Sequence, residues 1–191
     1  MKTMKILSLI VAVGLLFSCE ENEVSTKPES SELSVLGSLV GQNGTPYSES
    51  IDNWSELKST NGNSYIYQTS FYSWIGEGSI TEILVIEGIV TSRSYEHFRI
   101  NEANDEREII DTYAETIENL GVNEEGARPI TIDELYNTCA REYLTVDTGN
   151  NTIYFETALN GLMTLCGYVP TECLDDCFTG VSINHFDWVR I

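Results

Sequence analysis

The sequence predicts an α+β domain whose helices pack on one face of an antiparallel sheet. Three observations lead to this prediction. Strand-like runs fill residues 65–100, two amphipathic segments at helical spacing fill residues 105–144, and strand-like runs return over residues 152–189. Separate runs of strands and helices are typical of α+β domains. The sheet is therefore expected to hold a three-stranded meander plus C-terminal strands.

The first elements follow from apolar spacing and turn residues. Residues Ser48 to Lys58 place apolar side chains at helical spacing, and Asn61-Gly62-Asn63 ends the predicted helix. Three runs rich in Tyr, Ile, Val, Thr and Phe then predict strands, at Tyr65 to Trp74, Ser79 to Ile86 and Ile89 to Ile100. Glu87-Gly88 predicts a tight hairpin and Gly76-Glu77-Gly78 a looser one.

Two helices are predicted next. Asp105 to Leu120 aligns apolar side chains on one helical face, with Asp105 and Glu108 as a capping pair and Gly121 as the stop; these side chains are Ile109, Ile110, Tyr113, Ile117 and Leu120. Thr131-Ile132-Asp133-Glu134 has the form of a capping box and starts a second helix that runs to about Leu144.

The C-terminal part predicts three more strands. Thr152 to Leu159 and Leu162 to Tyr168 flank Asn160-Gly161, a dipeptide that accepts the positive φ angles of a type I′ turn. A last strand at about Val181 to Val189 is expected to complete the sheet.

The sequence predicts three parts in the chain. They are an export signal over residues 1–18, a tether over residues 19–50 and a single domain over residues 51–191. Lys2 and Lys5 precede an apolar stretch of 12 residues, Ile6 to Phe17. That stretch is shorter than the about 20 residues that span a bilayer, so it fits a signal peptide. The tether is rich in Ser, Glu, Gly, Asn and Thr, and a few apolar residues in it are expected to form a short strand or a turn of helix.

The signal ends in Leu16-Phe17-Ser18-Cys19, which resembles the lipobox of bacterial lipoproteins. The resemblance implies that the chain is cut before Cys19 and lipidated on that cysteine. Phe17 is bulkier than the usual residue at its position. Glu20-Glu21-Asn22-Glu23 follows and is similar to the surface-export signal of Bacteroidetes-type lipoproteins, which implies an outer-membrane anchor facing the cell exterior. The alternatives are an ordinary secretory signal, and an acidic linker that faces the periplasm.

Four further cysteines predict two disulfides, because an even number of cysteines in an exported chain usually pairs. The expected pairs are Cys139 with Cys166 and Cys173 with Cys177. The first pair joins a helix that covers the sheet to one of its strands, and the second closes a loop on itself. A zinc site is the alternative, but the spacing of the cysteines is not that of a zinc ribbon.

The charge excludes one class of partner. The chain has 10 Lys and Arg against 30 Asp and Glu, a formal charge of −20. Nucleic acid is therefore not expected as a partner, since phosphate binding needs clustered basic residues.

No catalytic motif stands out, and no cofactor is expected; calcium is an alternative. His97 and His185 have no local ligand pattern beside them and are expected to be structural or surface histidines. Oxygen ligands for calcium are present in one loop, at Glu172, Asp175 and Asp176, where the alternative is a turn or capping role. Several aromatic residues either form a ligand platform or belong to the core; they are Trp54, Trp74, Trp188, Tyr65, Tyr67 and Tyr72.

The domain also resembles a family of small bacterial lipoproteins that carry a domain of unknown function. The resemblance covers about residues 51 to 189 and rests on sheet and turn motifs, including Val85-Ile86-Glu87-Gly88-Ile89-Val90 and Cys166-Gly167-Tyr168. It implies the fold and the membrane anchor, and no activity.

The expected function is therefore binding rather than catalysis. The chain is predicted to be a lipid-anchored, surface-exposed lipoprotein whose domain binds an unknown protein or ligand outside the cytoplasm. One alternative is an anchored enzyme inhibitor that presents the loop Gly167 to Gly180, and another is an envelope hydrolase.

Overall fold

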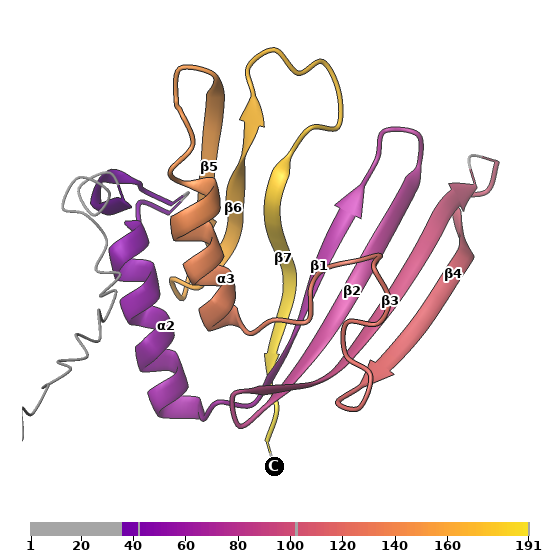
Figure 1. The fold of residues 1–191 in the computed structure, drawn as a ribbon, viewed down its shortest axis with the longest axis horizontal. Coiled ribbons are helices and arrows are strands. Elements are labelled where there is room, and N and C mark those ends of the chain that lie inside the picture. Colours follow the sequence, from indigo (N-terminus) through magenta and orange to yellow (C-terminus); the bar gives the residue numbers. More distant parts are fainter. Residues whose placement is uncertain (1–35, 42, 102, 191) are drawn as a thin grey trace, which may run out of the picture.

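The computed structural model describes residues 36–41, 43–101 and 103–190, which build a large antiparallel sheet with two main helices beside it (Figure 1). The elements are α2 (Tyr47–Asn61), β1 (Tyr65–Tyr72), β2 (Glu77–Ile86), β3 (Ile89–Asn101), β4 (Glu106–Thr116), α3 (Ile132–Thr138), the π-helical turn η1 (Cys139–Tyr143), β5 (Asn151–Thr157), β6 (Met163–Pro170) and β7 (Thr179–Trp188). Within the described residues the sheet has seven strands, in the order β4-β3-β2-β1-β7-β6-β5. An antiparallel sheet accompanied by helices is confirmed, and the sheet is one strand larger than predicted.

The predicted helix over Asp105 to Leu120 is wrong, because this segment forms β4 and pairs with β3 along its whole length. The side chains of Ile109, Ile110 and Ile117 are exposed, so no apolar stripe is buried as a helix would require. The register shifts between His97 and Phe98, which brings Ile109 and Ile110 into a bulge. The same apolar spacing therefore fits a bulged strand, and that strand pairs the edge of β3 that a helix would have left bare.

The tight turn predicted at Glu87-Gly88 is confirmed. Both residues have positive φ angles, 51° at Glu87 and 82° at Gly88, as a type I′ turn requires. The Glu87 amide donates to Ser64 Oγ at 2.9 Å, and the Gly88 amide donates to the carbonyl of Asn63 at 2.7 Å. These bonds join the β2–β3 turn to the start of β1.

The β5–β6 hairpin is confirmed, but its turn is not type I′. Only Gly161 has a positive φ, 80°, and its amide donates to the carbonyl of Ala158 at 2.9 Å. The Ala158 amide in turn donates to the carbonyl of Leu162 at 2.8 Å. This is the pattern of a type I turn followed by a left-handed glycine, which joins strands through a longer loop than a type I′ turn does.

The helices meet the sheet through aromatic side chains. Trp54 of α2 packs edge-on against Tyr65 of β1, with ring centroids 5.2 Å apart, and stacks on Trp188 of β7 at 5.7 Å. Such pairs add roughly 0.5–1.5 kcal/mol beyond the burial of their area. The Tyr65 hydroxyl also accepts a hydrogen bond from the first amide of α3, that of Ile132, at 3.0 Å. One tyrosine therefore contacts both helices.

The helix predicted from Thr131 begins as expected. Thr131 Oγ1 accepts from the Glu134 amide, and the Glu134 carboxylate accepts from the Thr131 amide, so the capping box is present. The helix widens into η1, where Cys139 forms a disulfide with Cys166 of β6 across a Cα–Cα distance of 5.8 Å. Both predicted disulfides are confirmed; the second joins Cys173 to Cys177.

Part of the predicted tether is ordered against the domain. Leu36 and Leu39 pack on the core, and Val40 pairs with Pro46 in an isolated bridge. Helix α2 then begins at Tyr47, whose ring is buried and whose hydroxyl donates to the carbonyl of Tyr136 at 2.8 Å. The docking of these apolar residues explains why they interrupt an otherwise polar segment.

Candidate functional site

The sheet opens at one end, between β1 and β7. These strands pair from Tyr65–Trp188 as far as Thr69–Ile183. Beyond that point β1 stays paired with β2 to Tyr72, while the other part of β7, from Ser182 back to Thr179, pairs with β6. The two strands therefore diverge and leave a wedge, visible between β7 and β1 in Figure 1.

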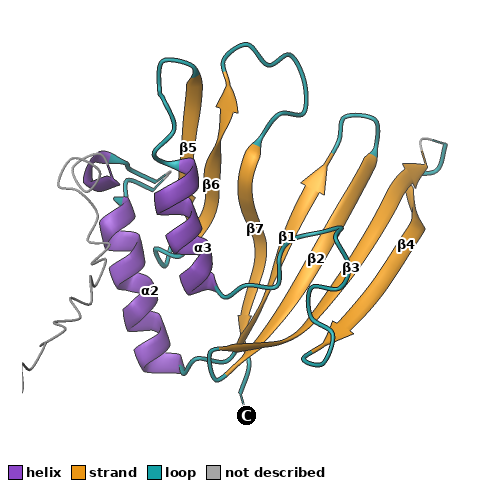
Figure 2. Cartoon of the chain, in the orientation of Figure 1, coloured by secondary structure: helices purple, strands orange, loops and turns teal. Residues whose placement is uncertain are grey.

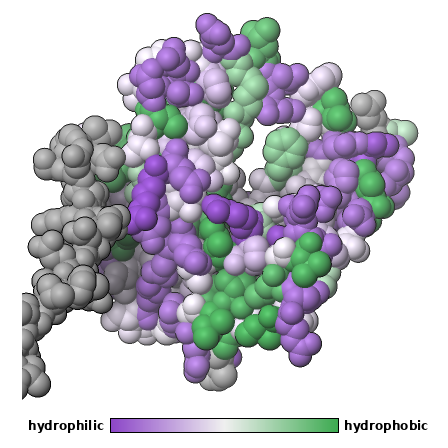
Figure 3. All heavy atoms as spheres, in the orientation of Figure 1, coloured by the Kyte–Doolittle hydropathy of each residue, from purple (hydrophilic) through white to green (hydrophobic). Residues whose placement is uncertain are grey.

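The wedge leads into a hollow that we call the splayed-end groove. It consists of two adjoining spaces of about 300 Å³ and 340 Å³ that share Phe71 and Ser79. Its other lining residues are Thr69, Ser70, Thr81, Gly126, Ala127, Gly180, Val181 and Ser182 in the first space, and Ser73, Ile75, Glu77, Gly78, Tyr95 and His97 in the second. Figure 3 shows the molecule hollowed at this end, between the β1–β2 hairpin and the β6–β7 loop.

Exposed apolar side chains surround the groove and form what we call the apolar rim. They are Phe71, Trp74 and Ile75 from the β1–β2 hairpin, and Leu174 from the β6–β7 loop. Tyr72 and Phe178 are also exposed, but they pack on Phe98 and Tyr154, on the other face of the sheet. Trp74 is 75% exposed and Leu174 is fully exposed. Aromatic side chains of this kind dominate the energetics of protein interfaces.

Three local features hold the rim in place. In the β1–β2 hairpin the Ser73 amide donates to the carbonyl of Glu77 at 2.8 Å, and Gly76 supplies the positive φ, 81°, that closes the turn. In the β6–β7 loop the disulfide between Cys173 and Cys177 closes a short ring. The two loops meet where Ser73 Oγ donates to Asp176 Oδ2 at 2.7 Å.

The acidic group in the groove is already paired. Glu77 forms an ion pair with Arg99, and His97 Nε2 lies 3.7 Å from its other carboxylate oxygen. The hydrogen bond from Arg99 lowers the pKa of Glu77, with the positive charge of Arg99 acting in the same direction. A carboxylate held ionised by an arginine is a weak proton acceptor, so this arrangement does not favour acid–base catalysis.

A buried ion pair fixes one wall of the groove. Arg93 of β3 and Glu115 of β4 join through two hydrogen bonds, Nη2 to Oε1 at 2.8 Å and Nε to Oε2 at 2.9 Å. Arg93 Nη1 also donates to the carbonyl of Ala127, a wall residue, at 2.9 Å, and the Ala127 amide donates to Thr81 Oγ1 at 2.9 Å. The segment between β4 and α3 is thereby held across the sheet as a loop (Figure 2).

Glu115 stays ionised despite its burial. Burial raises the pKa of its carboxyl, but hydrogen bonds from Arg93 and from the amides of Asn123 and Gly121 outweigh that effect and lower the pKa to about 2. The Arg93–Glu115 pair has a structural role, because its polar atoms are hydrogen-bonded to each other and to the backbone of the β4–α3 loop.

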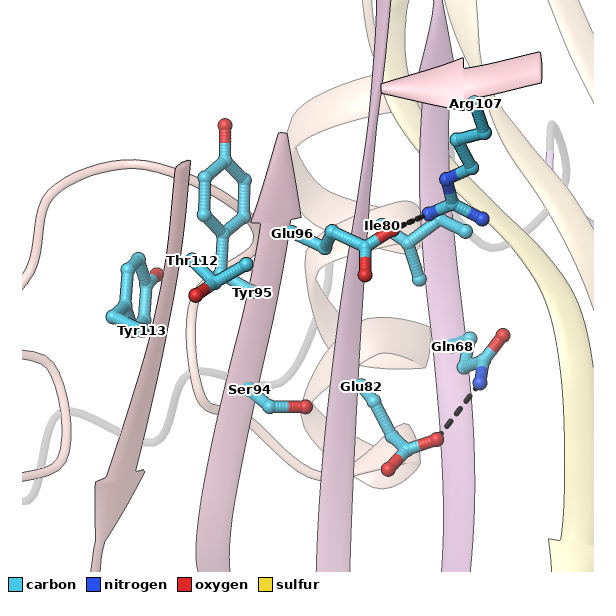
Figure 4. Close-up of a pocket in the computed structure, with 9 residues that line it drawn as sticks. All are labelled: Gln68, Ile80, Glu82, Ser94, Tyr95, Glu96, Arg107, Thr112 and Tyr113. Carbon is cyan, nitrogen blue, oxygen red and sulfur yellow. Dashed lines mark hydrogen bonds and ion pairs between the residues drawn. The ribbon is translucent and has the colours of Figure 1, made fainter. Parts of the chain in front are cut away.

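A larger hollow, of about 480 Å³, is lined mainly by polar side chains of β1 to β4 (Figure 4). Gln68 Nε2 donates to Glu82 Oε2 at 2.7 Å, and Arg107 pairs with Glu96. Tyr95 is the next residue after Ser94 in β3, so it points to the opposite face of the sheet, where it stacks on Tyr113. Arg107 neutralises Glu96, and Glu82 is already hydrogen-bonded to Gln68, which makes this hollow a weaker candidate than the splayed-end groove.

Two further apolar side chains, Ile117 and Val122, are exposed on the β4–α3 loop and form a smaller apolar surface. It has fewer aromatic side chains than the rim and borders no hollow among those described above.

The residues predicted to bind calcium lie on the β6–β7 loop. Glu172, Asp175 and Asp176 are exposed there, and Asp176 accepts its hydrogen bond from Ser73. Within the part of the chain that the structure describes, no three His, Cys, Asp or Glu side chains are grouped so that they could hold a metal ion. All four of the remaining cysteines are in disulfides, and Cys19 lies outside the described residues.

The aromatic residues divide into two groups that their sequence positions do not reveal. Trp54, Tyr65 and Tyr67 are buried in the core, whereas Trp74 lies on the rim and Tyr72 is exposed on the other face of the hairpin. Sequence reasoning missed the splayed-end groove, because the divergence of β1 from β7 depends on pairing between segments more than 100 residues apart. One sequence feature could have indicated it: the apolar residues Trp74 and Ile75 at the tip of a hairpin, where a turn exposed to water usually carries polar residues.

Comparisons with protein-family models, curated proteins and solved structures found no match to this chain. Among the described helices, none combines the length and the apolar character needed to cross a bilayer.

Proposed function

We propose that this protein is a lipid-anchored binding protein of the outer membrane, which faces the cell exterior and holds a partner molecule in the splayed-end groove. The observation that carries the proposal is the apolar rim, which presents four large exposed side chains, Phe71, Trp74, Ile75 and Leu174, beside one hollow. Apolar groups gathered in this way mark interaction sites, because their exposure to water is unfavourable unless a partner covers them.

The arrangement of the domain is consistent with display. Helices α2 and α3 both contact the face of the sheet that carries Tyr65, and we infer that they cover this one face and leave the groove end open. We expect Cys19 to carry the lipid anchor, and Glu20, Glu21 and Glu23 to direct the protein to the outer face of the membrane. Two or more acyl chains on Cys19 give stable attachment without a transmembrane helix.

An anchored inhibitor is the second candidate. The observation that favours it is Leu174, which the Cys173–Cys177 ring holds fully exposed on a constrained loop. Constrained loops bind with less loss of conformational entropy. An inhibitor requires the loop alone, whereas binding in the groove requires both halves of the rim. Trp74→Ala should therefore weaken binding of the partner if the groove is the binding site, and should leave it unchanged if the protein is an inhibitor.

Display is tested by labelling intact cells with a membrane-impermeant reagent. The native protein should be labelled, the Cys19→Ala variant should lack lipid, and a variant with Glu20, Glu21 and Glu23 changed to Ala should be lipidated but hidden. A lipidated native protein that is never labelled would place the partner in the periplasm.

Binding at the rim is tested by photo-crosslinking on intact cells from a photoreactive residue at position 174. The matched control is position 159, because Leu159 is equally exposed but precedes β6 whereas Leu174 follows it, so the two lie at opposite ends of that strand. A discrete adduct from position 174, absent from position 159 and lost in Trp74→Ala, supports the proposal. Equal adducts from both positions refute it.

A further inference from the structure

We propose that the partner is an extended polypeptide segment with a basic residue at one end, which adds to the free edge of β1 at Ser70–Tyr72 as an additional strand. This inference rests on the binding function proposed above and names the class of partner. Exposed strand edges are known templates for peptide binding, in which main-chain hydrogen bonds supply much of the affinity.

The backbone of β1 directs unpaired groups into the wedge. The hydrogen bond from the Ser73 amide to Glu77 makes these residues a hydrogen-bonded pair, and such pairs alternate along an antiparallel ladder. Phe71 and Ser79 therefore form the next such pair, and the N–H and C=O groups of Ser70 and Tyr72 point away from β2. They point into the wedge, on the side of β1 where β7 is no longer paired beyond the Thr69–Ile183 pair.

The walls of the wedge leave room for a main chain. Most of the residues lining this space have small side chains: Thr69, Ser70, Ser79, Gly126, Ala127, Gly180 and Ser182. On the far side, β7 is paired only with β6 over Thr179–Ser182, so a second strand edge borders the same space. Small side chains and two facing edges fit an extended backbone better than they fit a compact ligand.

The acidic residues at the open end of the wedge favour a basic residue at the end of the segment that lies there. The β6–β7 loop carries Glu172, Asp175 and Asp176, and no Lys or Arg occurs between Arg141 and Arg190. Asp176 is bound to Ser73, immediately after β1, so carboxylates stand where an added strand would end. Attraction between exposed charges speeds association and weakens as salt is added.

The test uses the detergent-solubilised, lipidated full-length protein and a fluorescein-labelled peptide of seven residues, with lysines at both ends and an alternating valine and threonine core. Binding is followed by fluorescence anisotropy. Two further peptides are N-methylated, one at the odd-numbered amides and the other at the even-numbered amides. Only alternate amides of a strand face a given edge, so at least one methylated peptide should bind about tenfold more weakly or worse.

The protein side of the test compares Ser70→Pro with Ser70→Ala. Proline removes the amide that faces the wedge and is tolerated at a strand edge, whereas alanine keeps the amide and removes only the hydroxyl. Ser70→Pro should bind the peptide about tenfold more weakly than Ser70→Ala does, because only the proline variant lacks the amide. If Ser70→Pro fails to fold, the pair of methylated peptides still decides.

The outcomes separate the two proposals. No binding of the unmodified peptide at millimolar concentration, or equal binding of all three peptides, overturns strand addition. If position 174 still crosslinks on cells in that case, the binding function stands with a partner of different chemistry. If at least one methylated peptide binds about tenfold more weakly than the unmodified peptide, both proposals are supported.

Discussion

Replacing Glu115 with glutamine is expected to destabilise the domain strongly, because Glu115 and Arg93 are a buried and fully bonded pair. Their side chains are 0% and 2% exposed. Oε1 accepts from Arg93 and twice from Asn123, and Oε2 accepts from Arg93 and from the Gly121 amide. Whichever oxygen the amide NH₂ of glutamine replaces, it faces at least two donors, and the charge of Arg93 loses its partner.

The expected cost is about 3–5 kcal/mol, the usual result of removing one partner of a buried ion pair. For a domain of this size that corresponds to a fall in melting temperature of about 6–20 °C. The assay is thermal and urea unfolding followed by circular dichroism. Because the pair also holds the groove wall at Ala127, binding at the groove should weaken as well.

The matched control is Glu96→Gln, which breaks the Arg107–Glu96 pair between the same two strands. Its side chains are 38% and 35% exposed, so the expected cost is at most about 1 kcal/mol. A loss below about 1 kcal/mol for Glu115→Gln, or equal losses for the two variants, would refute the view that burial and the loop amides make the first pair important.

Three further predictions concern pH, the disulfides and the rim. Since the pKa of Glu115 is lowered to about 2, its contribution to stability is complete above about pH 4.3 and is lost as the pH falls toward 2, so acid titration of the unfolding free energy should show a step that Glu115→Gln lacks. Changing both Cys139 and Cys166 to alanine should cost about 3.5 kcal/mol by chain entropy for a separation of 27 residues, whereas changing both Cys173 and Cys177 should cost about 2 kcal/mol for a separation of 4; calorimetry that gave the reverse order would contradict the loop-closure reasoning. Leu174→Ser should alter stability by less than about 0.5 kcal/mol yet weaken partner binding, while Leu159→Ser should change neither, as paired unfolding and binding curves would establish.

The sequence predicted the elements whose signals are local. The capping box at Thr131 and the strands around Glu87-Gly88 depend on residues within a few positions of one another. The disulfide pairing was also predicted, because it followed from placing Cys139 on a helix that covers the strand of Cys166. In each case the residues that determine the element are close in the chain, or their pairing needs only the order of the elements.

The error at β4 has a physical reason. Ile109, Ile110 and Tyr113 repeat at a spacing that suits a helix, and it suits a bulged strand equally well. The choice between them depends on β3, whose edge needs a partner, and on Arg93, whose charge needs Glu115 in the interior. Neither requirement can be read from residues 105–120 alone.

The sequence by itself determined the net charge of −20 and predicted correctly an antiparallel sheet with helices and both disulfides, while the lipid anchor on Cys19 stays a prediction. Only the tertiary structure decided which aromatic residues are core and which are rim, and that β1 and β7 separate after Thr69–Ile183. The reason is that burial and strand pairing join segments far apart in the chain: Ser73 meets Asp176 across 103 positions. Local patterns specify the elements, and the groove arises only where distant elements meet and part.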